Sequence, residues 1–141
     1  MYEGHCLCGA VTYRYDGPLG PITLCHCDMC QRGRGSAFSA TAPIQGVHIR
    51  WQGQANVTEY ESSPGRFRAF CSQCGTPIYH RVDAIAGLLR LSISTLSGPH
   101  TLKVDHETYV AHEATWFAPL SEVPAPRYAG SRRNSQPSSD V

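Results

Sequence analysis

Three short motifs carry the seven cysteines of the chain. They read HCLCG at 5–9, CHCDMC at 25–30 and CSQCG at 71–75. Clustered cysteines in a reducing compartment bind metal more often than they form disulfides, and an odd number cannot all be paired with one another. The motifs therefore predict metal-binding thiolates, with zinc as the expected ion. The proposed ligands are Cys6, Cys8, Cys25, Cys27, Cys30, Cys71 and Cys74.

The Cys-x-Cys spacing of the first motif predicts two thiolates on one side of the chain. In an extended backbone, residues i and i+2 point to the same face, so the Cys6 and Cys8 side chains share a face. A flat strand would hold them roughly 6 to 7 Å apart, which is too far for one zinc ion with ligand bonds of about 2.3 Å. The backbone must therefore curl, and Gly9 directly after Cys8 would permit this.

The Cys-x-x-Cys spacing brings two sulfurs together around a tight turn. Cys71 and Cys74 have this spacing, and Gly75 follows them where such a turn often needs a positive φ. Cys27 and Cys30 repeat the spacing inside the second motif. A thiol/disulfide role for that second pair is a weaker alternative, because the surrounding pattern is not βαβ.

The ligand count explains why the number of cysteines is odd. A structural zinc site has four ligands, whereas three protein ligands leave one coordination position open. Two pairs, Cys6/Cys8 and Cys71/Cys74, would complete a structural site and leave the CHCDMC motif as an open site. Spacing alone also allows other partitions, such as Cys6/Cys8 with the first two cysteines of CHCDMC. A histidine could instead close the second site, and the candidates are His5, His26 and His80.

An open zinc site with three thiolates favours one kind of chemistry. Three negative ligands overcompensate the charge of Zn²⁺, so the ion is a poor Lewis acid for making hydroxide. It suits the binding of a fourth thiol, whose pKa it lowers and whose sulfur stays nucleophilic toward a small electrophile. Glutathione is the abundant soluble thiol, and its two carboxylates would need cationic groups or backbone N–H donors nearby.

The residues after the three-cysteine motif are candidates for binding such carboxylates. Arg32 and Arg34 alternate with glycines in a predicted loop, and Gly35 would let backbone N–H groups approach a ligand closely. Two arginines in a glycine-rich segment are also typical of a solvated surface. Weaker candidates are Arg81 and two residues that strand alternation places on one exposed face, Arg66 and Arg68.

Period-2 alternation of apolar residues predicts a mainly β fold of several small sheets. Only one short helical turn is expected, after Cys27. We expect one domain over 1–128 and a flexible polar tail over 129–141, because the end of the chain is rich in Ser, Arg and Asn. The expected strands cover 10–15, 22–26, 36–42, 47–51, 56–61, 66–71, 77–82, 88–94 and 107–111.

The overall charge of the chain gives no indication of nucleic-acid binding and excludes few other functions. The chain has 12 Lys and Arg against 11 Asp and Glu, for a formal net charge of +1, and therefore no basic footprint. It begins MYEGHCLCGA without the pattern of a signal peptide, and no apolar run approaches the roughly 18 to 20 residues that span a bilayer. These features predict a soluble, cytoplasmic protein, and they say nothing about its oligomeric state.

Four segments of the chain resemble, in order, the blocks of the glutathione-dependent formaldehyde-activating enzyme family, also called the centromere-protein-V/formaldehyde-activating (GFA) domain. They read GHCLCGAV, CHCDMCQRGRGSAF, RFRAFCSQCGTPIYHR and HETYVAHEATWFAPLSEVPAPRY. The resemblance covers about residues 4 to 128. The chain departs from the common pattern at Ser97 and Gly98, where an acidic pair often stands.

The resemblance implies a zinc-binding β-tent fold of small antiparallel sheets. It implies a structural zinc on the residues that match Cys6, Cys8, Cys71 and Cys74, and a labile zinc on those that match Cys25, Cys27 and Cys30. The implied activity is a carbon–sulfur lyase reaction, the condensation of glutathione with formaldehyde to S-hydroxymethylglutathione. The alternative is a non-catalytic zinc module that binds a thiol, a protein or a nucleic acid.

Overall fold

A computed structural model describes residues 1–117 and 126–132 of the chain. The described residues fall into two compact units. The first comprises Met1–Gly20 and Thr41–Thr101, and the second comprises Pro21–Ala40 with the described part of Leu102–Val141. Each unit holds one of the two predicted cysteine clusters, so each is described by itself.

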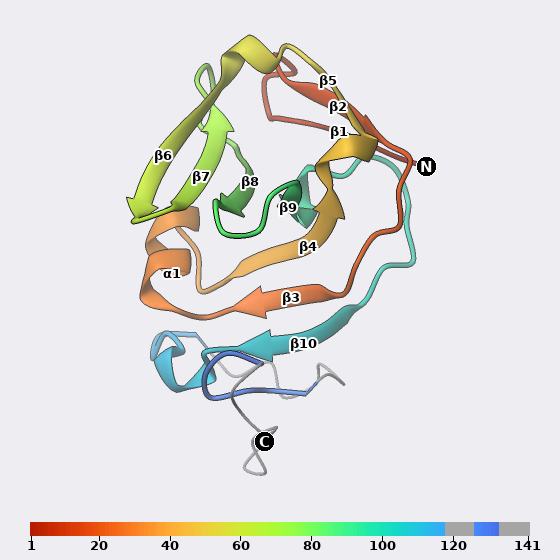
Figure 1. The fold of residues 1–141 in the computed structure, drawn as a ribbon. Helices are drawn as coiled ribbons and strands as arrows, with labels where there is room; N and C mark the ends of the chain where they lie inside the picture. Colours follow the sequence, from red (N-terminus) through yellow and green to blue (C-terminus); the bar gives the residue numbers. More distant parts are fainter. Residues whose placement is uncertain (118–125, 133–141) are drawn as a thin grey trace. The chain divides into compact units, whose positions relative to one another are not determined.

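A three-stranded antiparallel sheet opens the first unit. Its strands run in the order β1 (Tyr2–His5), β2 (Thr12–Tyr15) and β5 (Ile49–Gln52) (Figure 1). The loop between β1 and β2 carries the first cysteine pair. Strand β1 was not predicted, because Gly4 interrupts its pattern. The glycine is required there: a Cβ atom would meet the hydroxyl of Tyr13 at 2.2 Å and the carbonyl of Thr95 at 2.5 Å.

A larger antiparallel arrangement completes the first unit. Its neighbouring strands are β4 (Ser39–Gln45), β9 (Leu88–Ser92), β8 (Pro77–Val82), β7 (Arg66–Cys71) and β6 (Val57–Ser63), with β4 paired to β9 through residues 41–45. The second cysteine pair lies in the turn after β7. Single 3₁₀ turns lie at η1 (Gly46–His48), η2 (Gln54–Asn56) and η3 (Ile93–Thr95).

The core of the first unit has two apolar clusters, and cysteines belong to one of them. Tyr13, Tyr15, Ile44, Ile49 and Leu91 form the first cluster. Cys6, Val11, Cys71 and Ile78 form the second. Trp51 packs against both, with ring centroids 5.4 Å from Tyr13 and 5.7 Å from Tyr79. Two predicted metal ligands are therefore buried side chains of the core.

The second unit is built on two parallel strands and one short helix. Strand β3 (Ile22–Cys25) pairs in parallel with β10 (Val104–Thr108), and helix α1 (Asp28–Arg34) follows β3 (Figure 1). A 3₁₀ turn, η4 (Val110–His112), follows β10. Residues 126–128 run beside β10: the N–H of Glu107 donates to the carbonyl of Pro126, and the N–H of Tyr128 donates to the carbonyl of Glu107.

Most of the predicted elements are present in the structure. The mainly β fold with several sheets is confirmed, as is the short helix after Cys27. The expected strand at 36–42 begins later, at Ser39. The strand expected at 107–111 has the wrong bounds, because β10 spans Val104–Thr108 and a 3₁₀ turn follows it. The β3–β10 pairing is parallel, whereas antiparallel sheets were expected.

The described part of the chain contains no helix long and apolar enough to cross a membrane. The predicted polar tail, 129–141, lies mostly outside the described residues. Within it, the carbonyl of Gly130 accepts the N–H of Tyr109 at 3.1 Å, and Arg132 lies 3.5 Å from a carboxylate oxygen of Asp105. The division into a 1–128 domain and a tail stays a prediction.

Candidate metal centres

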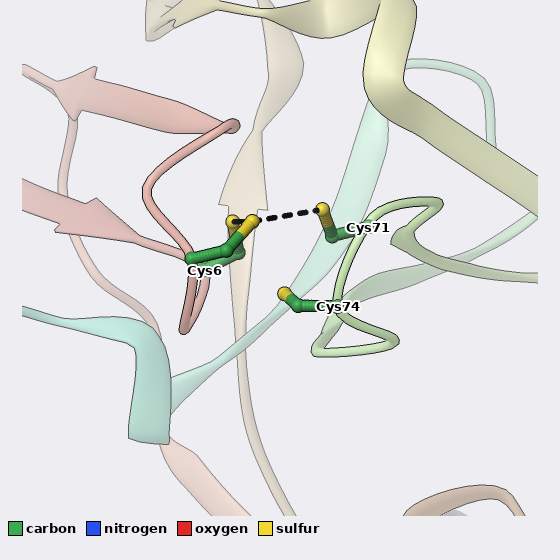
Figure 2. A group of neighbouring side chains, drawn as sticks. Cys6, Cys71 and Cys74 are labelled. Carbon is green, nitrogen blue, oxygen red and sulfur yellow. Dashed lines mark hydrogen bonds between the residues drawn. The ribbon is translucent and has the colours of Figure 1, made fainter.

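Four cysteine sulfurs of the first unit gather at one point. Those of Cys6, Cys8, Cys71 and Cys74 all lie within 4.8 Å of one another. The Cys6 and Cys8 sulfurs are 3.6 Å apart, and those of Cys8 and Cys71 are 3.9 Å apart. Figure 2 shows that Cys6 on one side and Cys71 and Cys74 on the other face the same small space. This grouping agrees with the first of the predicted partitions.

The loop after β1 curls as the Cys-x-Cys spacing requires. The N–H of Gly9 donates to the carbonyl of Cys6 at 3.1 Å, and the N–H of Cys6 donates to the carbonyl of Val11 at 3.0 Å. Gly9 has a φ of +78°, which a residue with a Cβ atom rarely adopts. The N–H of Val11 also points at the Cys6 sulfur, at 3.3 Å. Such a donor stabilises a sulfur that carries negative charge.

The turn after β7 has the form expected of a zinc knuckle. The N–H of Gly75 donates to the carbonyl of Cys71 at 2.8 Å, and the φ of Gly75 is +75°. The hydroxyl of Thr76 lies 3.2 Å from the Cys74 sulfur, and its backbone N–H also points there; these donors lower the pKa of the Cys74 thiol to about 5. The same hydroxyl accepts the N–H of Leu7 at 3.0 Å, which joins the two loops.

The four-sulfur group fits a zinc ion. Although the backbone N–H of Ala10 lowers the pKa of the Cys8 thiol, burial and the neighbouring thiols raise it to about 11. Four sulfurs this close cannot all be negative without a cation, and two of them, those of Cys6 and Cys71, are buried. A divalent ion with a preference for tetrahedral thiolate ligands matches this donor set. The four cysteines would hold it.

Three cysteine sulfurs of the second unit form a separate group. Those of Cys25, Cys27 and Cys30 lie within 4.8 Å of one another. Cys25 ends β3, Cys27 is the N-cap of α1, and Cys30 lies in the first turn of the helix. The N–H of Cys30 points at the sulfur of Cys27 at 3.4 Å. Hydrogen bonding with the other two thiols, followed by burial, raises the pKa of the Cys25 thiol.

No histidine joins either sulfur group within the described ranges, 1–117 and 126–132. The Nε2 atom of His26 lies 2.8 Å from Glu107, and Nδ1 of His5 lies 2.8 Å from the carbonyl of Cys6. The closed-site alternative with a histidine as fourth ligand therefore gains no support from the geometry. The three-cysteine group also fits zinc, as an ion with three protein ligands and one further position.

A buried ionic cluster lies beside the three-cysteine group. It contains His26, Glu107 and Glu113, whose candidate ligand atoms lie within 4.8 Å of one another. The guanidinium of Arg127 is paired with both carboxylates: its Nε lies 2.9 Å from Glu107, and its Nη2 contacts Glu113. Because this cation already pairs with both carboxylates, we assign the cluster as an ion-pair network. Sequence reasoning missed it, since its members are brought together only by the fold.

The structure corrects the expected environment of Arg32, Arg34 and Gly35. They were expected in a glycine-rich loop with free backbone N–H groups. Both arginines instead lie in the last turn of α1, and Gly35 is its C-cap with a φ of +58°. The N–H of Gly35 donates to the carbonyl of Gln31, so it is engaged in closing the helix. Arg32 is exposed and Arg34 is half-buried.

The fold and the two sulfur groups give the chain the architecture and donor set of a small β-sheet zinc protein. Comparison with known families agrees with this class. Residues 1–112 match the family model described as "Glutathione-dependent formaldehyde-activating enzyme". The match covers well over half of the chain, and the chain belongs to this family.

Two curated relatives and one solved structure are similar to the chain. It is 35% identical over 78 residues to an uncharacterized lyase of Schizosaccharomyces pombe, an alignment that covers 55% of this chain and 56% of the relative. It is 29% identical over 87 residues to a protein of Halomonas elongata named as a glutathione-dependent formaldehyde-activating enzyme, covering 56% of this chain and 55% of the relative. The chain thus spans little more than half the length of these relatives.

The solved structure is a crystal structure of a Rhodobacter sphaeroides protein. It aligns with a TM-score of 0.59 and 24% sequence identity, over 70% of this chain and 91% of that one. At this identity the likeness shows that the fold is shared and carries no conclusion about activity.

Proposed function

We propose that the protein is a zinc-dependent carbon–sulfur lyase that acts on an adduct of glutathione, with a reaction like that of S-(hydroxymethyl)glutathione synthase. The observation that carries the proposal is the three-cysteine group, which no fourth His, Cys, Asp or Glu ligand joins in the described part of the chain. Three protein ligands leave a tetrahedral zinc one position for a substrate. Family membership supports glutathione and formaldehyde as the substrates, and the two relatives are named as a lyase and as a formaldehyde-activating enzyme.

The proposed reaction joins a sulfur to a carbonyl carbon. When bound to three thiolates, zinc would offer its remaining position to a thiol and lower the pKa of that thiol. In the net reaction, the glutathione sulfur forms a bond to the carbon of formaldehyde and the carbon–oxygen double bond becomes single. The proton of the thiol ends on that oxygen, which gives S-hydroxymethylglutathione. The reverse reaction breaks the carbon–sulfur bond, as the term lyase describes.

The chain's own residues prepare the site before any substrate arrives. Cys25, Cys27 and Cys30 come from a strand end, a helix N-cap and the first helical turn, so their sulfurs converge without a long loop. The hydrogen bond from the Cys30 N–H to the Cys27 sulfur draws negative charge from that sulfur. Cys30 is buried, whereas Cys25 and Cys27 are only partly covered, which leaves a side by which a ligand can reach the group.

Of the two arginines on α1, Arg34 is the better placed to bind a carboxylate of glutathione. Residues four apart on a helix share a face, so Arg34 lies one turn after Cys30 on the same side. Arg32 is two residues from Cys30 and therefore points away from that face. Both arginines lie in the last turn of α1, where positive charge at the helix C-terminus is favourable whether or not either residue binds substrate.

The direct test is the formation of S-hydroxymethylglutathione by fully zinc-loaded protein, followed by NMR exchange between free and bound formaldehyde. Catalysis predicts an exchange rate above that of the uncatalysed mixture, and Cys25→Ser should bring the rate back to that background. Arg14→Gln, which breaks an exposed ion pair with Glu3, is the control and should keep the wild-type rate. A wild-type rate equal to the background would remove formaldehyde as the substrate.

A second measurement separates an open metal site from a closed, non-catalytic module. Cobalt can replace zinc, and its thiolate charge-transfer band reports the number of sulfur ligands. Added glutathione should strengthen this band in the wild-type protein. A band that glutathione leaves unchanged would favour the module that binds no exchangeable thiol.

A further inference from the structure

His26 lies between two of the proposed ligands of the second zinc and is held at three points. Its N–H donates to the carbonyl of Thr108 at 3.0 Å, and its own carbonyl accepts the Nε2 of Gln31 at 2.7 Å. Its ring Nε2 lies 2.8 Å from Glu107 Oε1. Because an ionised carboxylate only accepts, Nε2 carries the proton and donates. Main chain and side chain of this residue are therefore both fixed.

The partners of His26 are themselves anchored. Glu107 and Thr108 lie on β10, where they pair in register with Leu24 and Cys25 of β3. The Gln31 side chain donates a second hydrogen bond, to the carbonyl of His112 at 2.8 Å, which ties α1 to the turn after β10. The His26 ring packs edge-on against Phe38, with centroids 5.6 Å apart. These contacts all belong to the second unit.

The Glu107 carboxylate is fully buried and lies between the His26 ring and the Arg127 guanidinium. His26 faces one oxygen, and Arg127 Nε lies 2.9 Å from the other. Arg127 also contacts Glu113. A buried ion pair of this kind is weak evidence for a stabilising role, because an apolar set of similar volume is often as stable. It does impose one geometry, and here the geometry imposed is that of the backbone joining Cys25 to Cys27.

We propose that Glu107 and Gln31 are positioning residues for the three-cysteine centre: by holding the ring and the backbone carbonyl of His26, they fix the relative placement of the Cys25 and Cys27 sulfurs and so set the metal affinity of that centre. Neither residue is a ligand or touches substrate. The inference rests on the proposed second metal site and adds to it the residues that determine how firmly the metal is held. Substitutions in such supporting contacts typically weaken metal binding by 10- to 100-fold.

The test is a cobalt titration that resolves the two centres, performed on the full chain. Glu107→Gln keeps the volume of the side chain but removes its negative charge, so the contacts with the His26 ring and with Arg127 are both weakened. We expect the affinity of the second centre to fall about 10- to 100-fold while that of the four-cysteine centre stays within twofold. Glu113→Gln is the matched control, because Glu113 contacts Arg127, whereas the hydrogen bond of the His26 ring in the described residues goes to Glu107. It should leave both affinities within twofold.

Gln31→Ala keeps the proposal testable if the buried substitution prevents folding. Gln31 is only half-buried, so this variant should fold, and its second centre should lose at least about tenfold in affinity. Wild-type affinities in both Glu107→Gln and Gln31→Ala, or an equal loss in Glu113→Gln, would overturn the positioning role. A wild-type protein that binds a single cobalt ion would instead contradict the second metal site itself, and with it the proposed function.

Discussion

The backbone N–H of Cys30 donates to the sulfur of Cys27 across 3.4 Å, so helix α1 begins on a residue of the three-cysteine group. The cysteine at this position has two roles: it caps the helix and it offers a sulfur to a metal. Serine is among the best helix N-caps but a poor zinc ligand, which makes the two roles separable.

Cys27→Ser is therefore expected to keep the helix and lose the second metal. Far-UV circular dichroism should be unchanged, and the thermal midpoint should move by no more than a few degrees. Metal analysis after gel filtration should show one zinc fewer per chain. Cys27→Ala serves as the control, since it removes both the cap and the ligand and should cost about 1 kcal/mol more in unfolding free energy than the serine variant. Retention of both zincs by Cys27→Ser would contradict the ligand assignment.

Cys71→Ser should destabilise the protein far more than Cys25→Ser. Cys71 is completely buried in the cluster with Val11 and Ile78, and its loss removes a ligand that joins two distant loops. Loss of a structural metal is one of the few single changes that cost about 4 kcal/mol or more. Urea denaturation of the zinc-loaded variants measures the difference. Equal destabilisation by the two substitutions would mean that the four-cysteine group is not the structural centre.

Arg34→Gln should raise the KM for glutathione roughly tenfold, the cost of about one charge-assisted hydrogen bond. The bound zinc should be unaffected, because the arginine is not a ligand. Arg32→Gln on the same helical turn is the matched control, and its KM should stay within twofold. Equal effects from both arginines would point to general electrostatic attraction, and no effect from either would remove α1 from the glutathione site.

The ion pair between Glu59 and Arg81 predicts a pH dependence of stability. Arg81 donates to both carboxylate oxygens of Glu59, at 2.8 and 2.7 Å, and this hydrogen bonding lowers the pKa of Glu59 below its ordinary value of 4.5. A lowered pKa means that the unfolded state binds a proton first as pH falls. The pair therefore stabilises the fold above pH about 4.5, and this contribution is lost as the pH drops through the folded-state pKa.

Arg81→Gln should remove that dependence. Unfolding free energies of the wild type and the variant, measured by urea titration from pH 7 to pH 3, should differ less at the acidic end than at pH 7. The gap at pH 7 should be modest, because the pair is partly exposed. Arg14→Gln, which breaks the exposed pair with Glu3, is the control and should change stability by a few tenths of a kcal/mol. A constant gap across this pH range would contradict the role of Glu59.

Local rules were enough to predict the cysteine groups. The spacing of Cys71 and Cys74 with Gly75, and that of Cys6 and Cys8 with Gly9, sets the turn geometry, and the structure shows both glycines at positive φ. Counting sulfurs then made the four-and-three division one of the few that a tetrahedral ion allows. The alternation of apolar residues predicted eight of the ten strands in the described residues, close to their observed ranges, for the same local reason.

Contacts between distant residues could not be predicted in this way. His26 and Glu107 are 81 positions apart, and neither belongs to a motif that requires the other. Their pairing depends on the parallel register of β3 and β10, which no local pattern encodes. Strand β1 was missed because Gly4 is unfavourable in a strand by propensity, and its role became visible only with the Tyr13 ring packed above it.

The central claim is that one zinc is held by four cysteines and another by three. The most direct test is zinc stoichiometry of the full chain before and after mild chelation. We expect two zincs per chain at the start and one after chelation, with the remaining ion lost only when the protein unfolds. Cys25→Ser should begin with the single tight ion. Two zincs that resist chelation equally, or a wild-type protein that never binds more than one, would contradict the open second centre.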